Sequence, residues 1–345
     1  MLKFKKKNSH LKDIKRLRIP ENRDLENGLR LNRNEKVDVW PENFLNDIFN
    51  KKSDSFLSIY PDLSNLYNKI SDHIGIDESK ILVTSGIDGA MKTLWEISTE
   101  AGDLVGVPGP TYAMYYVYNK LFCTNLNEIN YNVEDRKLDW DQLNNFLDLK
   151  PSIFFLPNPN QPIEDTLSLD KLEDLAKKTS KNGTLFVVDE AYYYFGADTA
   201  MQLVNNYNNV VVMRTFSKGF GAPSIRLGYM VSNNDNMEYF SKTRFAHETS
   251  ALSSAVAEYF LDNFDFIKNY NEKVIMARED IKTKLNYEGI PCYGDKGNYL
   301  LINLGTQERC SNITSILEDN LIYVKSNYSK PWESYILITV GPMNK

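Results

Sequence analysis

The chain has 345 residues, of which 42% are hydrophobic and 25% charged, a composition typical of globular proteins with more than one domain or lobe. Its formal net charge of -6 argues against a nucleic-acid-binding protein, because such proteins normally present a basic surface. No apolar run is long enough to span a bilayer, and the 3 cysteines are scattered without metal-ligand spacing. We therefore expect a reduced, cytoplasmic protein that binds neither membranes nor metal ions.

Residues 1–18 form a basic arm. Its lysines and arginines are Lys3, Lys5, Lys6, Lys7, Lys12, Lys15, Arg16 and Arg18. No apolar segment follows these charges, so the arm does not have the pattern of a signal peptide. We expect a solvated arm, and a docking surface is the alternative interpretation.

Two short segments follow the arm. Residues 31–35 read LNRNE and show little periodicity, as is common in asparagine-rich turns. The pair Tyr60-Pro61 comes after a stretch rich in Phe, Leu and Ile. Neither segment indicates a function by itself.

Five short apolar runs predict buried strands, and each ends in a polar loop that bears glycine or proline. The runs are residues 81–83, 104–107, 153–156, 184–188 and 210–213. Helical patterns lie between them, for example over residues 90–98 and 170–180. Strands that alternate with helices predict a mainly parallel sheet, and ligands of such sheets bind at the carboxyl ends of the strands.

The loops at these strand ends carry the candidate chemistry. Residues 84–89 lead into a helix whose free N–H groups and positive dipole end suit a phosphate. Asp189 ends the fourth strand, where a buried carboxylate requires a cationic partner. Lys218 lies beyond the fifth strand, and burial there favours a neutral, nucleophilic amine. Groups that bind phosphate oxygens lie close to it in sequence, at Thr215, Ser217 and Arg226.

The segment SKGFGAPSIRLGY, which begins at Ser217, resembles the cofactor-binding segment of fold-type I pyridoxal 5'-phosphate (PLP) aminotransferases of class I/II. It is most similar to the histidinol-phosphate aminotransferase group, and DEAY at 189–192 and PTYAMY at 110–115 match the same family. The resemblance covers about residues 31–341. It implies an α/β fold with a large PLP-binding domain, residues 46–234, built on a mainly parallel sheet flanked by helices. Residues 19–45 and 235–345 would form a smaller α+β domain that caps the substrate.

The resemblance also implies a role for each matching residue. Lys218 would hold PLP as an imine and move the substrate's α-proton, and Asp189 would pair with the ring nitrogen. Tyr192 would donate to the phenolic oxygen, and Tyr112 would stack on the ring. The phosphate contacts would be Ile87, Asp88, Gly89, Thr215, Ser217 and Arg226. Tyr60 would reach the phosphate of the neighbouring subunit, so a homodimer with shared active sites is implied.

The chain departs from the family pattern at several positions. Gln161 takes the place of the asparagine that bonds the phenolic oxygen in N-P-x-N-P-T-G, and Ile163-Glu164 replaces the Thr-Gly. Gly89 stands where the family has a glutamate. Leu337 replaces the arginine of L-R-I-T-V-G, which holds the substrate's α-carboxylate. The remaining candidate substrate contacts are Arg33, Asn34, Arg244, His247 and Lys325.

These observations predict a PLP-dependent aminotransferase that moves an amino group between an amino-acid donor and a small carbonyl substrate. Leu337 favours a substrate that is phosphorylated or free of carboxylate, because an ionised carboxylate against leucine would lose hydration without compensation. The alternatives are a PLP-dependent decarboxylase of an amino-acid phosphate and a PLP-fold protein that binds or regulates without turnover. A rearranged loop that replaces the missing arginine would instead allow ordinary keto acids.

Overall fold

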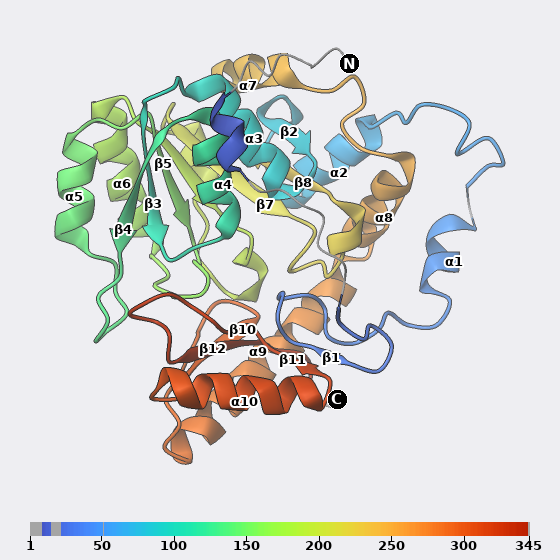
Figure 1. Ribbon diagram of the computed structural model, residues 1–345. Coiled ribbons are helices and arrows are strands. Elements are labelled where there is room, and N and C mark those ends of the chain that lie inside the picture. The colour runs from blue at the N-terminus through green and yellow to red at the C-terminus, as the bar shows by residue number, and fades with distance from the viewer. Residues whose placement is uncertain (1–8, 15–21, 51, 344–345) are drawn as a thin grey trace, which may run out of the picture.

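The computed structural model describes residues 9–14, 22–50 and 52–343. A seven-stranded sheet with helices on both faces forms the upper part of the molecule in Figure 1, and two small sheets lie below it. The basic arm falls outside the described residues except for 9–14, so of its predicted charges only Lys12 is described.

The large sheet has the strand order β2-β8-β7-β6-β5-β3-β4. Its strands are β2 (Ile81–Thr84), β3 (Leu104–Gly109), β4 (Asn125–Asn130), β5 (Ile153–Pro157), β6 (Leu185–Asp189), β7 (Val210–Thr215) and β8 (Gly228–Val231). Strand β8 is antiparallel to both of its neighbours, and the other pairings of this sheet are parallel. The prediction of an α/β fold with a mainly parallel sheet is therefore confirmed.

Helices cover both faces of this sheet, which explains why its inner strands are mainly apolar, whereas the edge strand β4 reads NLNEIN and is only partly buried. In β7, Val210 and Val212 join the hydrophobic core on one face, while Val211 and Met213 join the core on the other. The first face is covered by α2 (Ser64–Ile74), α5 (Trp140–Asp148), α6 (Leu169–Asn182) and α8 (Ala251–Asp262). The second is covered by α3 (Gly86–Ser98), α4 (Ala113–Phe122) and α7 (Asn234–Phe240).

Helix α6 illustrates how local sequence determines these helices. Leu172, Leu175 and Thr179 recur at helical spacing, and all three are buried against the sheet. Burying each of these leucines contributes about 2 kcal/mol relative to exposure. The helix ends at Gly183, whose φ of 73° lies in the left-handed region that glycine adopts without steric cost.

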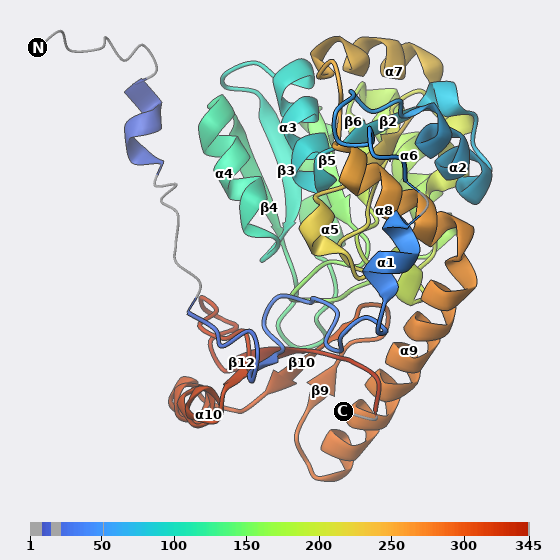
Figure 2. The ribbon, with the colours of Figure 1, turned by 90° about the vertical axis from the view of Figure 1, so that its right-hand side faces the viewer.

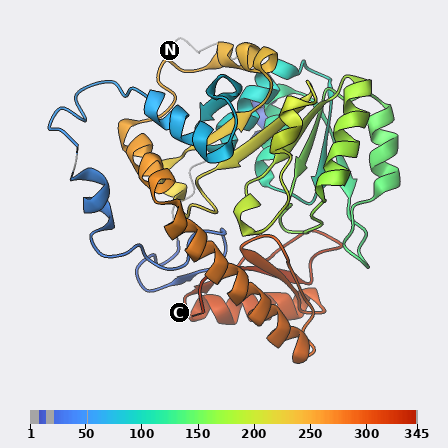
Figure 3. The same ribbon diagram turned by 180° about the vertical axis from the view of Figure 1, so that it is seen from behind.

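Two small sheets lie opposite the carboxyl ends of the large sheet (Figure 2). One is antiparallel with the order β12-β10-β9, and the other pairs β1 with β11 in parallel. Their strands are β1 (Leu29–Arg30), β9 (Cys292–Tyr293), β10 (Tyr299–Asn303), β11 (Ile322–Tyr323) and β12 (Tyr335–Thr339). Helix α9 (Phe264–Tyr287) runs from the side of the large sheet to the small sheets, as Figure 3 shows from behind. The remaining α-helices are α1 (Phe44–Phe49) and α10 (Gln307–Asp319).

The stretch predicted to be helical over about 253–285 forms two helices, α8 and α9, that meet at Asn263. The φ of -118° and ψ of 38° at Asn263 lie outside the helical region, so one continuous helix is interrupted there. Met237 and Phe240 of α7 are buried in the core of the large sheet, although the predicted domain boundary falls at 234/235. This packing favours a boundary near Asn263, and the division into domains stays a prediction.

Among the described residues, no helix is long and apolar enough to cross a bilayer, and no cluster of His, Cys, Asp and Glu side chains is arranged to hold a metal ion. The cysteines Cys123, Cys292 and Cys310 are all free thiols.

Candidate active site

A cavity of about 860 Å³ opens between the carboxyl ends of the large sheet and the small sheets. Most of the predicted site residues line it. They are Arg33, Asn34, Ile87, Asp88, Tyr112, Gln161, Asp189, Tyr192, Thr215, Ser217, Lys218, Arg226 and Lys325. The convergence of loops from β2, β3, β5, β6 and β7 on one cavity follows from the parallel arrangement of these strands, whose carboxyl ends share one edge.

Lys218 lies three residues beyond β7, at the floor of this cavity. Its Nζ donates hydrogen bonds to the main-chain oxygens of Arg33, at 2.7 Å, and Asn34, at 3.4 Å. Burial lowers the pKa of Lys218 to about 8, and the charge of Glu35 opposes this shift. At neutral pH roughly a tenth of this amine is therefore uncharged, far more than for an exposed lysine.

Asp189 ends β6 and is 5% exposed. Its two oxygens accept hydrogen bonds from the hydroxyl of Tyr115, at 2.9 Å, and from the backbone N–H of Ala191, at 3.0 Å. No described lysine or arginine forms an ion pair with it, and burial raises the pKa of Asp189 to about 6. The site therefore contains a buried carboxylate whose ionised form lacks a cationic partner.

The start of α3 and the loop after β7 form a concave cradle. Gly86 begins α3 with a φ of 67°, and a Cβ added there would lie 3.1 Å from Nη2 of Arg226. Opposite, the hydroxyls of Thr215 and Ser217 lie 3.0 Å apart. The guanidinium of Arg226 donates to the Pro223 oxygen at 3.1 Å. Hydroxyls, a guanidinium and the first-turn N–H groups of a helix together match the oxygens of a phosphate.

Asp88 belongs to the same cradle, and Gly89 lies beside it in α3. Oδ2 of Asp88 lies 3.4 Å from Nη2 of Arg226, so the guanidinium is held over the helix terminus. Gly89 does not line the cavity, and a Cβ added there would meet Ser85 and Thr84 at 3.4 Å, an ordinary contact. A side chain at position 89 would therefore point towards Thr84 and Ser85 and not into the cavity.

Three further groups lie around the centre of the cavity. Tyr112 precedes α4 and is 44% exposed, so one face of its ring is open to a ligand. The hydroxyl of Tyr192 accepts a hydrogen bond from Nδ2 of Asn34 at 2.8 Å. Gln161 lines the cavity, and its buried Nε2 has no hydrogen-bond partner among the described residues. An unpaired amide donor in a cavity is costly unless a ligand supplies an acceptor.

At the substrate end, Leu337 is fully buried in the hydrophobic core and does not line the cavity. Its backbone bridges to that of Lys325 through hydrogen bonds of 3.0 and 2.7 Å. Lys325 does line the cavity, with Nζ 3.4 Å from Oε1 of Gln161, and burial lowers its pKa. No described carboxylate forms an ion pair with Lys325. Lys325 is therefore a buried cation of the cavity lining, and its backbone pairs with the leucine that replaces the arginine of the family pattern.

Besides Gly89, three predicted site residues, Tyr60, Arg244 and His247, do not line the cavity of their own chain. Tyr60 is 80% exposed, and its ring stacks on His247 with centroids 4.4 Å apart. Arg244 lies in the same loop as His247 and forms an ion pair of 3.6 Å with Glu248. The two stacked rings are exposed on the surface. Tyr60 and His247 could contact a cofactor or substrate, as predicted, only in the cavity of a second subunit.

Two residues that sequence reasoning did not single out, Tyr115 and Tyr328, contact site residues from behind the cavity lining. Tyr115 donates to the Asp189 carboxylate, and it lies three residues after Tyr112 on the buried side of α4. That helical spacing is a signal that could have found it. Tyr328 has a buried hydroxyl without a partner in the described residues, and its ring lies 5.7 Å from Nζ of Lys325. Nothing in the local sequence singles out Tyr328.

Comparison with known proteins gives consistent matches over nearly the whole chain. The family model described as aminotransferase class I and II matches residues 27–344. A histidinol-phosphate aminotransferase of Clostridium novyi (strain NT) is 28% identical over 334 residues, which cover 96% of this chain and 92% of that protein. A dihydroxyacetone phosphate transaminase of Campylobacter jejuni is 28% identical over 298 residues, which cover 84% and 79%.

A solved structure shows the same fold. The structure of histidinol-phosphate aminotransferase from Sinorhizobium meliloti in complex with pyridoxal-5'-phosphate has a TM-score of 0.87 at 22% sequence identity, covering 99% of this chain and 94% of that chain. The family predicted from the sequence motifs is therefore confirmed. This chain belongs to the aminotransferase class I and II family.

Proposed function

We propose that the chain is a PLP-dependent aminotransferase whose carbonyl acceptor carries a phosphate and lacks an α-carboxylate. The observation that carries the substrate proposal is the pair Leu337 and Lys325. The position of the carboxylate-binding arginine holds a core leucine, while a buried lysine without a carboxylate partner among the described residues remains at the cavity. The relative from Campylobacter jejuni, named for dihydroxyacetone phosphate, supports the same substrate class, because that ketone has a phosphate and no carboxylate.

The residues of the cavity fit PLP. Asp189 offers a buried carboxylate without a cationic partner among the described residues, which a protonated ring nitrogen would match. Gln161 offers an amide donor without a hydrogen-bond partner among the described residues. The cradle between Gly86 and Arg226 would hold the phosphate together with Thr215 and Ser217. Tyr112 would cover the ring, and Tyr192 would donate a hydrogen bond to its phenolic oxygen.

When bound, PLP supplies an electron sink for the substrate carbon that loses its proton. The chain supplies the other groups. Lys218, whose amine is partly uncharged near neutral pH, would take the proton from that carbon and would later donate a proton to complete the transfer of the amino group. Asp189 would stay ionised next to the protonated ring nitrogen of the bound cofactor, and its charge would favour that protonation. Tyr115 and Ala191 orient the carboxylate for this task.

Lys325 would hold the anionic end of each substrate in turn. A lysine is a point charge on a flexible stem, so it binds a phosphate or a carboxylate without the bidentate geometry that arginine imposes. A charge-assisted hydrogen bond of this kind is worth about 1.5–3 kcal/mol. Arg33 is the other cation of the lining outside the predicted cofactor contacts, and we propose that it assists with the donor's carboxylate.

We also propose that the enzyme is a homodimer in which each subunit completes the cavity of the other. Exposed apolar side chains gather on the segments around Tyr60 and His247. They are Leu45, Leu57, Ile59, Phe245 and Leu252. A second copy that covers them would bring Tyr60, His247 and Arg244 towards a partner cavity. A cytoplasmic location is proposed on the free cysteines.

The substrate proposal is tested with purified holoenzyme and two panels of acceptors. We expect kcat/KM for dihydroxyacetone phosphate and similar carboxylate-free phosphates to exceed that for ordinary α-keto acids. Lys325→Met should raise KM for the phosphates about 10- to 100-fold, and Lys325→Arg should retain most of the affinity. If keto acids are preferred in both half-reactions, the Leu337 argument is wrong. Release of CO2 from an O-phosphorylated amino acid, without conversion of the cofactor to its amine form, would instead identify the decarboxylase alternative.

A further inference from the structure

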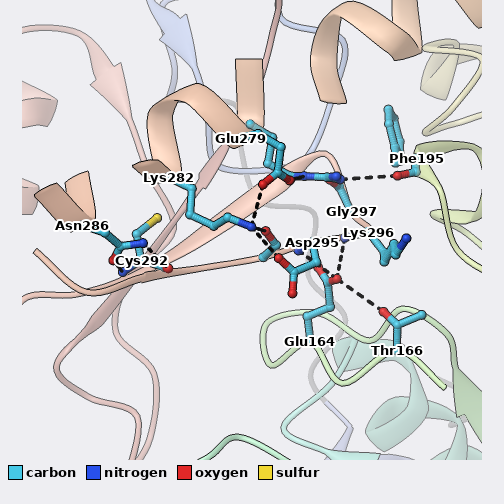
Figure 4. A network of polar contacts seen from close by, with 12 residues as sticks. Glu164, Thr166, Phe195, Glu279, Lys282, Asn286, Cys292, Asp295, Lys296 and Gly297 are labelled. Atoms are coloured by element: carbon cyan, nitrogen blue, oxygen red, sulfur yellow. Dashed lines mark hydrogen bonds and ion pairs between the residues drawn. The ribbon is translucent and has the colours of Figure 1, made fainter. Parts of the chain in front are cut away.

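Glu164 makes an unusual contact for a residue so close to the cavity. It lies in the loop between β5 and α6, which carries Gln161 into the cavity, but its side chain reaches towards the small sheets (Figure 4). Oε1 of Glu164 accepts hydrogen bonds from the backbone N–H groups of Asp295, at 3.0 Å, and Lys296, at 2.5 Å. The hydroxyl of Thr166 donates to the same oxygen at 3.3 Å. The contact therefore joins two loops 131 or more residues apart in the chain.

The loop that receives Glu164 is itself fixed to α9. Nζ of Lys282 contacts the Gly294 oxygen at 3.2 Å and the Asp295 carboxylate at 2.5 Å. The guanidinium of Arg278, which is 3% exposed, donates to the Gly297 oxygen at 2.8 Å. Residues 294–297 thus present their N–H groups to Glu164 from a rigid position.

The loop after β5 has a second connection to the small sheets. The hydroxyl of Tyr299, on β10, donates to the backbone oxygen of Asn160. Asn160 is fully buried, and its Nδ2 donates to the Pro110 oxygen at 2.9 Å and to the Ile163 oxygen at 3.0 Å. Gln161 therefore lies between two residues, Asn160 and Glu164, that are both held by the β9–β10 region.

We propose that Glu164 is a positioning residue for the active site, which sets the place of the Gln161 amide in the cavity by tying its loop to residues 294–297. The proposal links two departures from the family pattern in the same loop. Glutamine has a longer arm than the asparagine it replaces, and a longer arm requires a displaced or better-fixed loop. The glycine that Glu164 replaces has no side chain that could supply such a contact. Of the two experiments described below, the kinetic one rests on the proposed function, whereas the measurement of amide hydrogen exchange does not.

Electrostatics supports a specific role for this carboxylate. Oε2 of Glu164 is buried without a partner among the described residues, and burial raises the pKa of the group. The charge of Asp295 raises it further, while the two amide donors and the charge of Arg278 oppose the shift. Burying the Glu164 carboxylate costs free energy because the group loses its hydration. The hydrogen bonds from residues 294–297 offset part of that loss.

The first test measures amide hydrogen exchange of the holoenzyme by mass spectrometry. Glu164→Ala removes the acceptor, and we expect exchange to become roughly tenfold faster both in residues 294–298 and in residues 158–163. Glu164→Gln keeps an acceptor oxygen and the side-chain length, so it should restore most of the protection. Thr166→Ala is the matched control, because it removes a donor to the same oxygen without crossing between the loops. Unchanged exchange in residues 158–163 of Glu164→Ala would overturn the proposal, whatever the substrate proves to be.

The second test is a double-mutant cycle with Gln161→Ala, using any acceptor that the wild type turns over. If Glu164 acts through Gln161, Glu164→Ala raises the acceptor's KM several-fold in the wild type and has no further effect in the Gln161→Ala background. The visible absorption spectrum of the bound cofactor should change in the same non-additive way. Additive effects on KM and on the spectrum would show that Glu164 only stabilises the fold.

Discussion

Asp189 gives the clearest quantitative prediction, because the same carboxylate should favour catalysis and oppose the stability of the cofactor-free protein. Burial raises its pKa from an ordinary 3.8 to about 6, since the ionised form loses hydration without gaining a cation. A shift of about two units corresponds to about 3 kcal/mol of differential free energy between the two protonation states. Above pH 6 the folded, cofactor-free protein carries this cost.

The substitution Asp189→Asn removes the charge and keeps the shape. Its amide oxygen can still accept from the N–H of Ala191, while the hydroxyl of Tyr115 can rotate to accept from the new NH2 group. We therefore expect the cofactor-free variant to be about 1–3 kcal/mol more stable than the wild type at pH 7.5. Its turnover should nevertheless fall by several orders of magnitude, because the ring nitrogen loses the anion that keeps it protonated.

The pH dependence tests the cause of this difference. Between pH 3.8 and 6 the folded wild type binds more protons at Asp189 than the unfolded chain does, so its free energy of unfolding falls as the pH rises. The slope is about 1.4 kcal/mol per pH unit, and the variant lacks this contribution. The stability gap between the two proteins should therefore be smaller at pH 5 than at pH 7.5 by about 1.4 kcal/mol.

The assay is urea unfolding of cofactor-free protein, followed by circular dichroism at equal protein concentrations at pH 5 and pH 7.5. Saturating PLP should reverse the order of stability, because a bound pyridinium pairs with the wild-type carboxylate alone. If the variant is less stable than the wild type by the same amount at both pH values, Asp189 does not carry an uncompensated charge. The proposed pairing with the ring nitrogen would then lose its main physical support.

Three further predictions concern single residues. Lys218→Ala protein should lose the adduct that borohydride traps between the chain and PLP, and a variant that still forms it would refute the assignment of this lysine. Mixing inactive Lys218→Ala protomers with inactive Tyr60→Phe protomers should restore activity in mixed dimers, because one cavity would then be complete; a verified mixed dimer without activity contradicts the shared site. Gly89→Ala should raise the free energy of unfolding by about 0.5–1 kcal/mol without weakening PLP binding, as thermal melting and cofactor titration can check, since the new methyl group meets only ordinary contacts.

Strands β2, β3, β5, β6 and β7 of the large sheet were predictable because they are apolar runs separated by helical patterns, whereas the edge strand β4, which reads NLNEIN, has no such run. The run Val210 to Met213, for example, has no polar residue and lies in the middle of the sheet. The break at Asn263 was not predictable, because asparagine is tolerated in helices and the apolar pattern continues across it. The antiparallel direction of β8 depends on the path of the connection over residues 216–227, which apolar periodicity does not report.

The residues at and around the cavity were likewise predictable only in part. Lys218, Asp189 and Arg226 follow strands or turns that local sequence identifies, so their convergence could be predicted from parallel topology. The partners of Glu164 and the burial of Leu337 depend on segments that lie far away in the chain. No local pattern encodes such contacts, and only the folded structure reveals that the missing arginine is replaced by core packing.

The hydrogen bonds of the Lys218 amine connect cofactor binding to a segment beside the small sheets. The amine is hydrogen-bonded to the main-chain oxygens of Arg33 and Asn34, on the segment that follows β1. A lysine nitrogen that condenses with a carbonyl carbon keeps at most one hydrogen, so cofactor loading would break at least one of these two hydrogen bonds. Asn34 would then be held by its contacts with Tyr192 and with Thr339. We expect the hydrogen bonds that hold this segment to differ between the PLP-free and the PLP-bound enzyme. The conformation of the segment beyond β1 would then depend on whether PLP is bound.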